Sequence, residues 1–325
     1  MRDTVLFGDC RKTLGTLQAQ ITTGIAERPR MCVTSPPYYG LRDYGGEDEQ
    51  IGQEQTPEEF VEQLVDVFRK VRDCLTDDGT LWLNIGDSYY NYRPGKGQAL
   101  NKQSVSNTKQ DLPDECPRRG NKLEGLKEKD LIGIPWMLAF ALRADGWYLR
   151  QDIIWHKPNP MPESVKDRCT KAHEYIFLLS KSKQYYYDNE AIKEPAKDWG
   201  TRDRSKGKYH NPGTGLSPHS GLEKSYEKKN KRSVWTVNKK PYKGAHFATY
   251  PRELIEPCIR AGSEKGDIIL DPFMGSGTTA MTAKELGRYY IGCELHKEYG
   301  DLMRKRLGLY YSLSTGGKAD TDDSD

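Results

Sequence analysis

The chain has 325 residues, of which 50 are Lys or Arg and 47 are Asp or Glu, so its formal net charge is +3. This length fits one large domain, or one domain with an inserted module. The mean hydropathy is −0.84, and no apolar run approaches the ~20 residues that span a bilayer. Residues 1–4 lack the layout of a signal peptide, so a membrane or secreted protein is not expected and a cytoplasmic location is predicted.

The elements expected along the chain alternate between strand-like and helix-like patterns, which is typical of an α/β fold. A short buried strand is expected at 31–34 and a helix at 56–75. In that helix Thr56 is the N-cap, Pro57 stands at N1 and Glu59 completes a capping box. The elements expected after it are a strand at 80–85, a helix at 134–145, strands at 147–155, 174–179 and 267–270, a helix at 277–286 and a strand at 289–293.

Two stretches interrupt this alternation. Residues 88–130 are polar, and residues 189–245 contain 14 Lys or Arg against six Asp or Glu, a local charge of about +8. Long irregular segments inside a compact domain are usually functional or disordered. We therefore interpret 1–187 and 246–312 as two halves of one domain, with 88–130 inserted in the first half. An acidic tail at 313–325 is expected to be disordered.

The cysteines indicate reduced thiols rather than a disulfide framework or a zinc cluster. Their number is odd, they are scattered, and none forms a Cys-x-x-Cys pair. His156 and His173 have no other His, Cys or carboxylate at metal-ligand spacing, so no metal is assigned. The seven cysteines are Cys10, Cys32, Cys74, Cys116, Cys169, Cys258 and Cys293.

The first chemical motif is the run Asp271–Thr279, which follows an apolar strand and opens a helix. Gly275 and Gly277 permit a tight turn and a close approach of the backbone to a ligand. Glu294 ends the next expected strand, 19 residues after Gly275. A carboxylate at that place can accept both hydroxyls of a ribose, so the pattern indicates a nucleoside-containing ligand.

The second motif is the run Thr34–Tyr38, directly after the strand at 31–34. Two consecutive prolines hold the backbone extended and remove two donors, so the carbonyls of Ser35 and Pro36 can face a ligand. Two acceptors that bind the N–H groups of an aromatic amine would localise its lone pair for attack on an electrophilic methyl group. Such catalysis acts by positioning and electrostatics rather than through a covalent nucleophile.

These two motifs resemble those of DNA amino-methyltransferases, and their order resembles that of the permuted β class. Leu6–Cys10 is similar to the opening strand end of that family. Asp152–Asn159 and His173–Tyr175 are similar to its base-pocket segment, and Tyr250–Ile255 is similar to the helix start before its cofactor loop. The resemblance therefore runs from about residue 6 to 300. It implies a Rossmann-like fold with a mixed seven-stranded sheet, helices on both faces and a circularly permuted motif order.

The resemblance also implies a cofactor, S-adenosyl-L-methionine, and a division of roles. Ser35, Pro36, Pro37 and Tyr38 would be catalytic, with Tyr38 stacked on a base that is flipped out of duplex DNA. The expected cofactor-binding residues are Asp9, Thr34, Pro251, Asp271, Phe273, Gly275, Ser276, Gly277, Thr278 and Glu294.

The expected target is the N4 amine of cytosine, because Ser at the first catalytic position favours cytosine within the family. Adenine N6 is the alternative, followed by an RNA or protein amide methyltransferase and by a DNA-binding module without activity. A cytosine C5 enzyme needs a Pro-Cys nucleophile. Pro257-Cys258 exists, but Cys258 falls on an apolar helical face and is expected to pack in the core.

The basic stretch 189–245 is the expected target recognition region, because it mixes cations with aromatic residues and turns. Residues 88–130 are expected to grip the DNA strand as a second insertion. A homodimer and a cognate restriction endonuclease are further partners that the resemblance raises. The candidate DNA contacts are Arg118, Arg119, Arg202, Arg204, Lys228, Lys229, Lys231 and Arg232.

Overall fold

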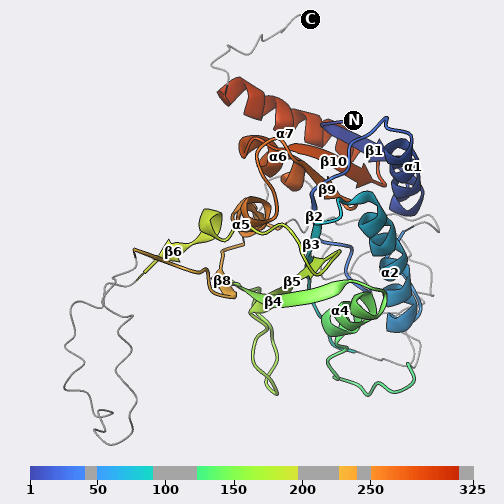
Figure 1. Ribbon diagram of the computed structural model, residues 1–325. Helices are drawn as coiled ribbons and strands as arrows, with labels where there is room; N and C mark the ends of the chain where they lie inside the picture. The colour runs from blue at the N-terminus through green and yellow to red at the C-terminus, as the bar shows by residue number, and fades with distance from the viewer. Residues whose placement is uncertain (41–49, 91–122, 197–226, 240–249, 315–325) are drawn as a thin grey trace, which may run out of the picture.

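The computed structural model describes residues 1–40, 50–90, 123–196, 227–239 and 250–314. Within these ranges an eight-stranded sheet lies at the centre, in the order β1-β10-β9-β2-β3-β5-β4-β8 (Figure 1). Its strands are β1 (Thr4–Phe7), β2 (Met31–Thr34), β3 (Thr80–Ile85), β4 (Tyr148–His156), β5 (His173–Ser180), β8 (Val234–Thr236), β9 (Ile268–Asp271) and β10 (Tyr289–Glu294). The helices are α1 (Cys10–Thr22), α2 (Pro57–Cys74), α4 (Ile134–Ala144), α5 (Arg252–Gly262), α6 (Thr278–Glu285) and α7 (Tyr299–Ser314).

Seven of these strands share one direction. Strands β1, β10, β9, β2 and β3 are parallel neighbours, β5 is antiparallel to both β3 and β4, and β8 is parallel to β4. The ends of seven strands and the start of β5 therefore meet along one side of the sheet, which we call the carboxyl edge. Strand β9, late in the chain, lies beside the early strand β2, as the permuted motif order requires.

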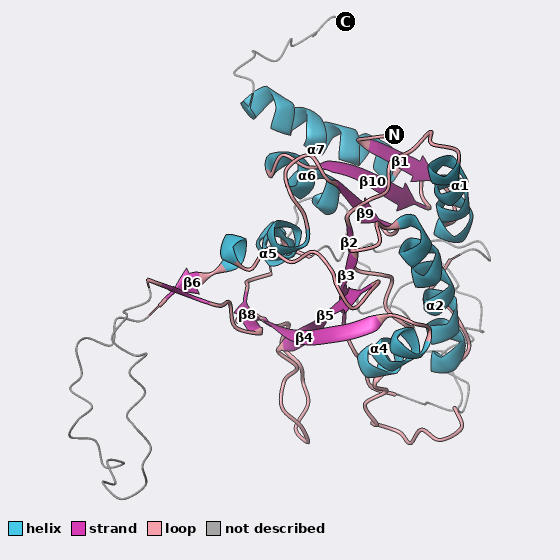
Figure 2. Cartoon of the chain, in the orientation of Figure 1, coloured by secondary structure: helices cyan, strands magenta, loops and turns pink. Residues whose placement is uncertain are grey.

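The mixed α/β class is confirmed, and the sheet has one strand more than the predicted seven. The additional strand is β8, which comes from the basic stretch and pairs with Ile154–His156 of β4. The described residues of that stretch also form a 3-10 turn at Glu190–Ile192 and a ribbon of β6 (Glu194–Pro195) with β7 (Lys228–Lys229). Figure 2 shows β6 away from the main sheet, on the side of β8.

Helices cover both faces of the sheet, as predicted. Helices α1, α2 and α4 lie on one face and α5, α6 and α7 on the other (Figure 1). Alternate residues of a strand point to opposite faces: in β2, Cys32 packs in the first core, whereas Met31 and Val33 pack in the second. Burial of apolar surface on both faces holds the strands in place, and with them the loops at the carboxyl edge.

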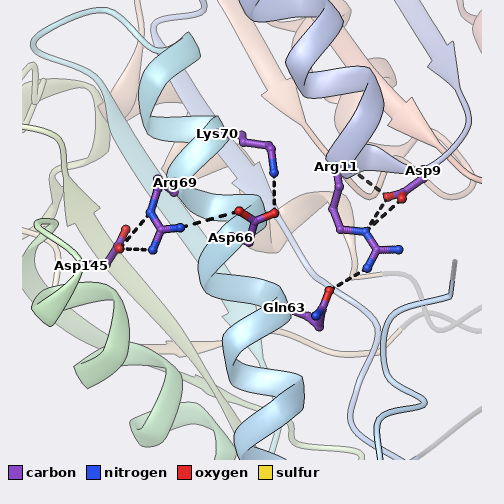
Figure 3. Close-up of polar contacts among 7 residues, drawn as sticks. All are labelled: Asp9, Arg11, Gln63, Asp66, Arg69, Lys70 and Asp145. Carbon is purple, nitrogen blue, oxygen red and sulfur yellow. Dashed lines mark hydrogen bonds and ion pairs between the residues drawn. The ribbon is translucent and has the colours of Figure 1, made fainter.

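Helix α2 begins as its sequence predicts. The Thr56 hydroxyl accepts the backbone N–H of Glu59 at 3.1 Å, and the Glu59 carboxylate accepts the N–H of Thr56 in return. At its outer face, Arg69 Nε donates to Asp145 Oδ1 at 3.0 Å and ties α2 to the end of α4 (Figure 3). The capping box and this cross-link fix α2 against its neighbours.

Two helices, one near each end of the described chain, differ from the prediction. Helix α1 and helix α7 were not predicted, and α7 includes residues 313 and 314, with which the predicted tail begins. The rest of that tail lies outside the described residues. In the part of the chain that the structure describes, no helix combines the length and the apolar character needed to cross a membrane.

Candidate active site

The carboxyl edge brings the two sequence motifs together. Glu294 ends β10, Asp271 ends β9 and Thr34 ends β2, and Asp9 follows β1 after a single glycine. Because these four strands are parallel neighbours, the four residues follow one another along the edge. The Ser35–Tyr38 tetrapeptide therefore starts next to the glycine turn of the first motif.

Asp271 joins the two motifs through hydrogen bonds. Its side chain accepts the Thr34 hydroxyl at 2.6 Å and the backbone N–H of Phe273 at 3.0 Å on Oδ1. Its Oδ2 accepts the Tyr250 hydroxyl at 3.1 Å and the Thr279 hydroxyl. Asp271 is only 1% exposed, and this burial raises the pKa of its carboxyl group. With four donors on one carboxylate, Asp271 fixes the end of β2 relative to the turn after β9.

The glycine turn has the backbone that its sequence indicates. Gly275 and Gly277 adopt φ values of +54° and +80°, and a Cβ on Gly277 would lie 2.9 Å from Met303 Cγ. Arg306 of α7 also holds this turn, since its Nη1 donates to the Ser276 carbonyl at 2.7 Å and to the Ser276 hydroxyl at 2.6 Å. The conformation is thus available to glycine and is supported from α7.

Glu294 has the acceptor capacity that a ribose would need. It is 6% exposed; Oε2 accepts the N–H of Gly275 at 2.8 Å and Oε1 accepts the N–H of His296 at 2.9 Å. Burial raises the pKa of the Glu294 carboxyl group. A carboxylate oxygen has two lone pairs, so each one retains a site for a hydroxyl donor. The residues present therefore fit the nucleoside part of the expected cofactor.

Asp9 caps helix α1 and is held by Arg11. Its Oδ1 accepts the backbone N–H of Arg11 at 2.9 Å, and the Arg11 guanidinium pairs with the same carboxylate at 3.0 Å. Arg11 Nη1 also donates to Gln63 Oε1 of α2 at 2.6 Å (Figure 3). The Gly8 N–H donates to the Glu294 carbonyl at 2.8 Å, which places Asp9 beside Glu294.

The tetrapeptide continues from Thr34 across the end of β3. Pro36 is buried, and the hydroxyl of Ser35 has no hydrogen-bond partner among the described residues. The Tyr38 hydroxyl donates to Glu174 Oε2 at 2.7 Å, at the start of β5. A Cβ on Gly86 would lie 2.7 Å from Tyr38 Cε2, so the Tyr38 ring packs directly on that glycine. The Tyr38 side chain is therefore fixed by its backbone after β2, by Gly86 after β3 and by Glu174 in β5.

Lys157, which is buried, and Glu174, which is half-buried, form an ion pair at the same place. The Lys157 ammonium donates to Glu174 Oε1 and lies 4.4 Å from the centre of the Trp155 ring. Asn84 Nδ2 donates to the Tyr175 carbonyl at 3.0 Å and to Glu174 Oε2 at 3.4 Å. Burial lowers the pKa of Lys157, because it disfavours the charged form more than Glu174 favours it.

The other candidate residues lie close to this edge or in the core. Pro251 is the N-cap residue of α5, and Phe273 contacts Phe68 with ring centres 6.5 Å apart. Cys258 is fully buried in α5, as predicted, and burial raises the pKa of its thiol, which is unsuited to a nucleophile. Among the described residues, no group of three or more His, Cys, Asp or Glu could hold a metal ion.

The structure describes only some of the basic residues that are predicted to contact DNA. Arg118, Arg119, Arg202 and Arg204 lie outside the described residues. Arg232 Nε and Lys231 Nζ pair with Glu194 at 3.2 and 3.5 Å, so two of the predicted DNA contacts share an internal acidic partner. Lys228 and Lys229 form β7. A cavity of about 260 Å³ lies between these segments and α5, lined by Glu194, Lys231, Arg232, Trp235, Glu253 and Pro257 among others.

Sequence reasoning missed several residues of the site. The pairing of Lys157 with Glu174 was not predicted, although both belong to segments that resemble the family's base pocket. The signal was a lysine between His156 and Pro158, just after the strand expected at 147–155. The supporting roles of Thr279 and Arg306 had no local signal, because each depends on contacts between distant segments.

The open α/β sheet, the glycine turn and the buried carboxylate are typical of enzymes that bind a nucleoside-containing cofactor at the carboxyl ends of the strands. A family of N6/N4 DNA methylases matches residues 30–305, and the chain belongs to this family.

The relatives agree with this assignment. The chain is 46% identical over 303 residues to type II methyltransferase M.SmaI of Serratia marcescens, covering 93% of this chain and 90% of the relative. It is 49% identical over 278 residues to M.Cfr9I of Citrobacter freundii, covering 86% and 81%.

Solved structures show the same fold. The cytosine-N4-specific PvuII DNA methyltransferase aligns with a TM-score of 0.56 at 16% identity, covering 98% of this chain and 94% of its own. A putative DNA modification methylase of Thermus thermophilus, complexed with S-adenosyl-L-methionine, aligns with a TM-score of 0.55 at 22% identity, covering 94% and 93%.

Proposed function

We propose that the protein transfers a methyl group from S-adenosyl-L-methionine to the exocyclic N4 amine of a cytosine that is flipped out of duplex DNA. The observation that carries this proposal is the hydrogen bond between Thr34 and Asp271, which sets the Ser35–Tyr38 tetrapeptide beside the glycine turn. Membership of the DNA methylase family supports a DNA substrate. The type II relatives support site-specific methylation, and the Thermus complex supports the cofactor.

The chemistry follows from the residues at the edge. When bound, the cofactor supplies a methyl group on a sulfonium sulfur. The Ser35 hydroxyl and the Pro36 carbonyl accept the two N–H groups of the target amine, which localises the nitrogen lone pair. The lone pair would then take the methyl group: a C–N bond would form as the C–S bond breaks, the demethylated cofactor would leave as a thioether, and the proton lost from the nitrogen would pass to solvent water. Tyr38 offers its ring to the base, and Glu294 accepts the ribose hydroxyls, so this chain contributes orientation and hydrogen bonding.

The choice of cytosine over adenine rests on Ser35. Purified protein incubated with duplex DNA and labelled S-adenosyl-L-methionine should place the label in N4-methylcytosine after digestion to nucleosides. Label in N6-methyladenine alone would overturn the N4 assignment. Label in RNA or protein, with DNA inert, would overturn the DNA substrate.

A Ser35→Ala variant tests the tetrapeptide directly. It should bind the cofactor normally and turn over about fivefold more slowly, since one of two acceptors of the amine is lost and such a bond contributes about 1 kcal/mol. Equilibrium titration and single-turnover kinetics measure the two effects separately. Wild-type turnover would show that the side chain has no role.

We infer that residues 189–245 contact the DNA, with Lys228, Lys229, Lys231 and Arg232 among the phosphate-binding candidates. Each phosphate contact that is removed should reduce the dependence of log K on log salt by about one. A Lys228→Gln variant should show this change, and an unchanged slope would exclude that residue. A homodimer, a cognate restriction endonuclease and a cytoplasmic location stay predictions.

A further inference from the structure

Lys157 is the one buried lysine among the described residues, at 5% exposure. Removing an ammonium group from water is costly, so a buried lysine needs a partner. Its partner is Glu174, brought to it by the antiparallel pairing of β4 with β5, in which His156 lies opposite His173. Replacing a buried ion pair by hydrophobic residues often leaves stability unchanged or raises it, so stability alone does not explain this pair. Its position at the carboxyl edge therefore indicates a role in binding.

The pair lies at the hydroxyl end of the Tyr38 ring. Glu174 accepts Tyr38 on one oxygen at 2.7 Å and Lys157 on the other. The Tyr38 ring extends from the tetrapeptide across Gly86 to reach this carboxylate. A planar base that stacks on this ring, with its amine at Ser35, therefore directs the opposite part of its hydrogen-bonding edge toward Lys157.

This inference rests on the function proposed above. We propose that Lys157 donates a hydrogen bond to O2 of the flipped cytosine and so selects cytosine over adenine, while Glu174 is a positioning residue that orients both Lys157 and Tyr38. An ammonium has three donors, and its contacts with described side chains are with Glu174 and the Trp155 ring. It can therefore donate to a further acceptor.

The two bases differ at the atom that Lys157 would reach. The edge of cytosine carries the N4 amine, the N3 acceptor and the O2 acceptor in sequence, whereas adenine carries its N6 amine, the N1 acceptor and a C–H. A site built to donate to O2 leaves its donor buried and without that acceptor when adenine enters. The selection follows from this missing acceptor rather than from the size of the base.

The test compares target sites that contain either cytosine or 2-thiocytosine, in which sulfur, a weaker acceptor, replaces O2. A hydrogen bond from a charged donor is stronger than a neutral one, and much of its contribution should be lost when sulfur replaces oxygen as the acceptor. The wild type should therefore show kcat/KM about tenfold lower on the thio site. This comparison does not depend on the folding of any variant, and equal rates on both sites would overturn the inference.

Variants of Lys157 then show whether this residue causes the difference in rate between the cytosine and 2-thiocytosine sites. Lys157→Met should lower kcat/KM on cytosine at least tenfold and abolish the difference between the two sites, whereas Lys157→Arg should retain part of it. Lys171→Met is the matched control: Lys171 lies three residues before Glu174 and its ammonium donates to the Asp87 carbonyl at 2.7 Å, so this change should leave the ratio unchanged. A Lys157→Met variant that is slower on both sites but keeps the wild-type ratio would show a merely structural lysine. If the wild type methylates adenine and not cytosine, the proposed function is wrong, and this inference is wrong with it.

Discussion

Replacing Thr34 by Val removes one hydroxyl and keeps the branched shape of the side chain. In the wild type this hydroxyl donates to the buried Asp271 carboxylate at 2.6 Å. A hydrogen bond to a charged group contributes about 1.5–3 kcal/mol. Phe273, Thr279 and Tyr250 still donate to Asp271, so the carboxylate keeps three partners. We therefore expect a loss of about 2 kcal/mol in the free energy of unfolding.

The effect on catalysis should exceed the effect on cofactor binding. Thr34 precedes Ser35, and a displacement of the tetrapeptide by about 1 Å would lower the rate about 100-fold. Urea denaturation gives the stability, equilibrium titration gives the Kd of the cofactor, and single-turnover methylation gives kcat. We expect kcat to fall by 10- to 100-fold and the Kd to change much less.

Thr80→Val provides a matched control at the opposite end of the sheet. Thr80 is also fully buried, and its hydroxyl accepts the Trp82 indole N–H at 3.2 Å at the start of β3. It should lower stability by about 1 kcal/mol and leave kcat unchanged. If Thr34→Val lowers stability but retains wild-type kcat, as the control does, the bond to Asp271 does not position the tetrapeptide.

Three further outcomes are expected. Burial raises the pKa of Glu294, so cofactor affinity should begin to fall at a higher pH than an ordinary glutamate would allow as the solution is acidified; titrations from neutral to acid pH measure this. The same shift means that the contribution of Glu294 to stability decreases as pH rises through its folded-state pKa. Gly86→Ala should displace Tyr38, whose Cε2 would lie 2.7 Å from the new Cβ, and lower kcat about tenfold in single-turnover assays. Thr56→Ala should reduce the free energy of unfolding by about 1 kcal/mol, because it removes the cap of α2, and leave the kinetics unchanged.

Each of these three predictions would be contradicted by a specific result. A Glu294→Gln variant should bind more weakly and lose the acid dependence, so an identical pH profile would reject the role of the carboxylate. Wild-type turnover of Gly86→Ala would mean that the Tyr38 ring need not rest on that glycine. A Thr56→Ala variant with unchanged stability would show that the cap bond at 3.1 Å contributes nothing measurable.

Local signals predicted the parts of the fold that depend on local physics. The start of α2 followed from Thr56, Pro57 and Glu59, whose capping interactions lie within four residues. The expected strand at 31–34 and the glycine turn also needed only neighbouring residues. Because parallel strands align their carboxyl ends, the approach of the second motif to the first could be expected without knowledge of the strand order.

Long-range pairing explains what the sequence did not reveal. Strand β8 has only three residues in a polar stretch, and it exists as a strand because it pairs with β4, about 80 residues earlier. The meeting of Lys157 with Glu174 depends on the register of β4 with β5, which no turn signal specifies. Helix α7 is connected to the glycine turn through Met303 and Arg306, contacts that have no local pattern.

The position of β8 constrains how this enzyme could be re-engineered for a new target sequence. The Trp155 indole donates to the Val237 carbonyl at 2.9 Å, and the Val237 N–H donates to the His156 carbonyl at 3.1 Å. A chimera that exchanged all of 189–245 would therefore unseat the strand next to Lys157. Within the proposed recognition region 189–245, grafts that leave Val234–Val237 in place should preserve turnover, whereas wider grafts should yield inactive hybrids.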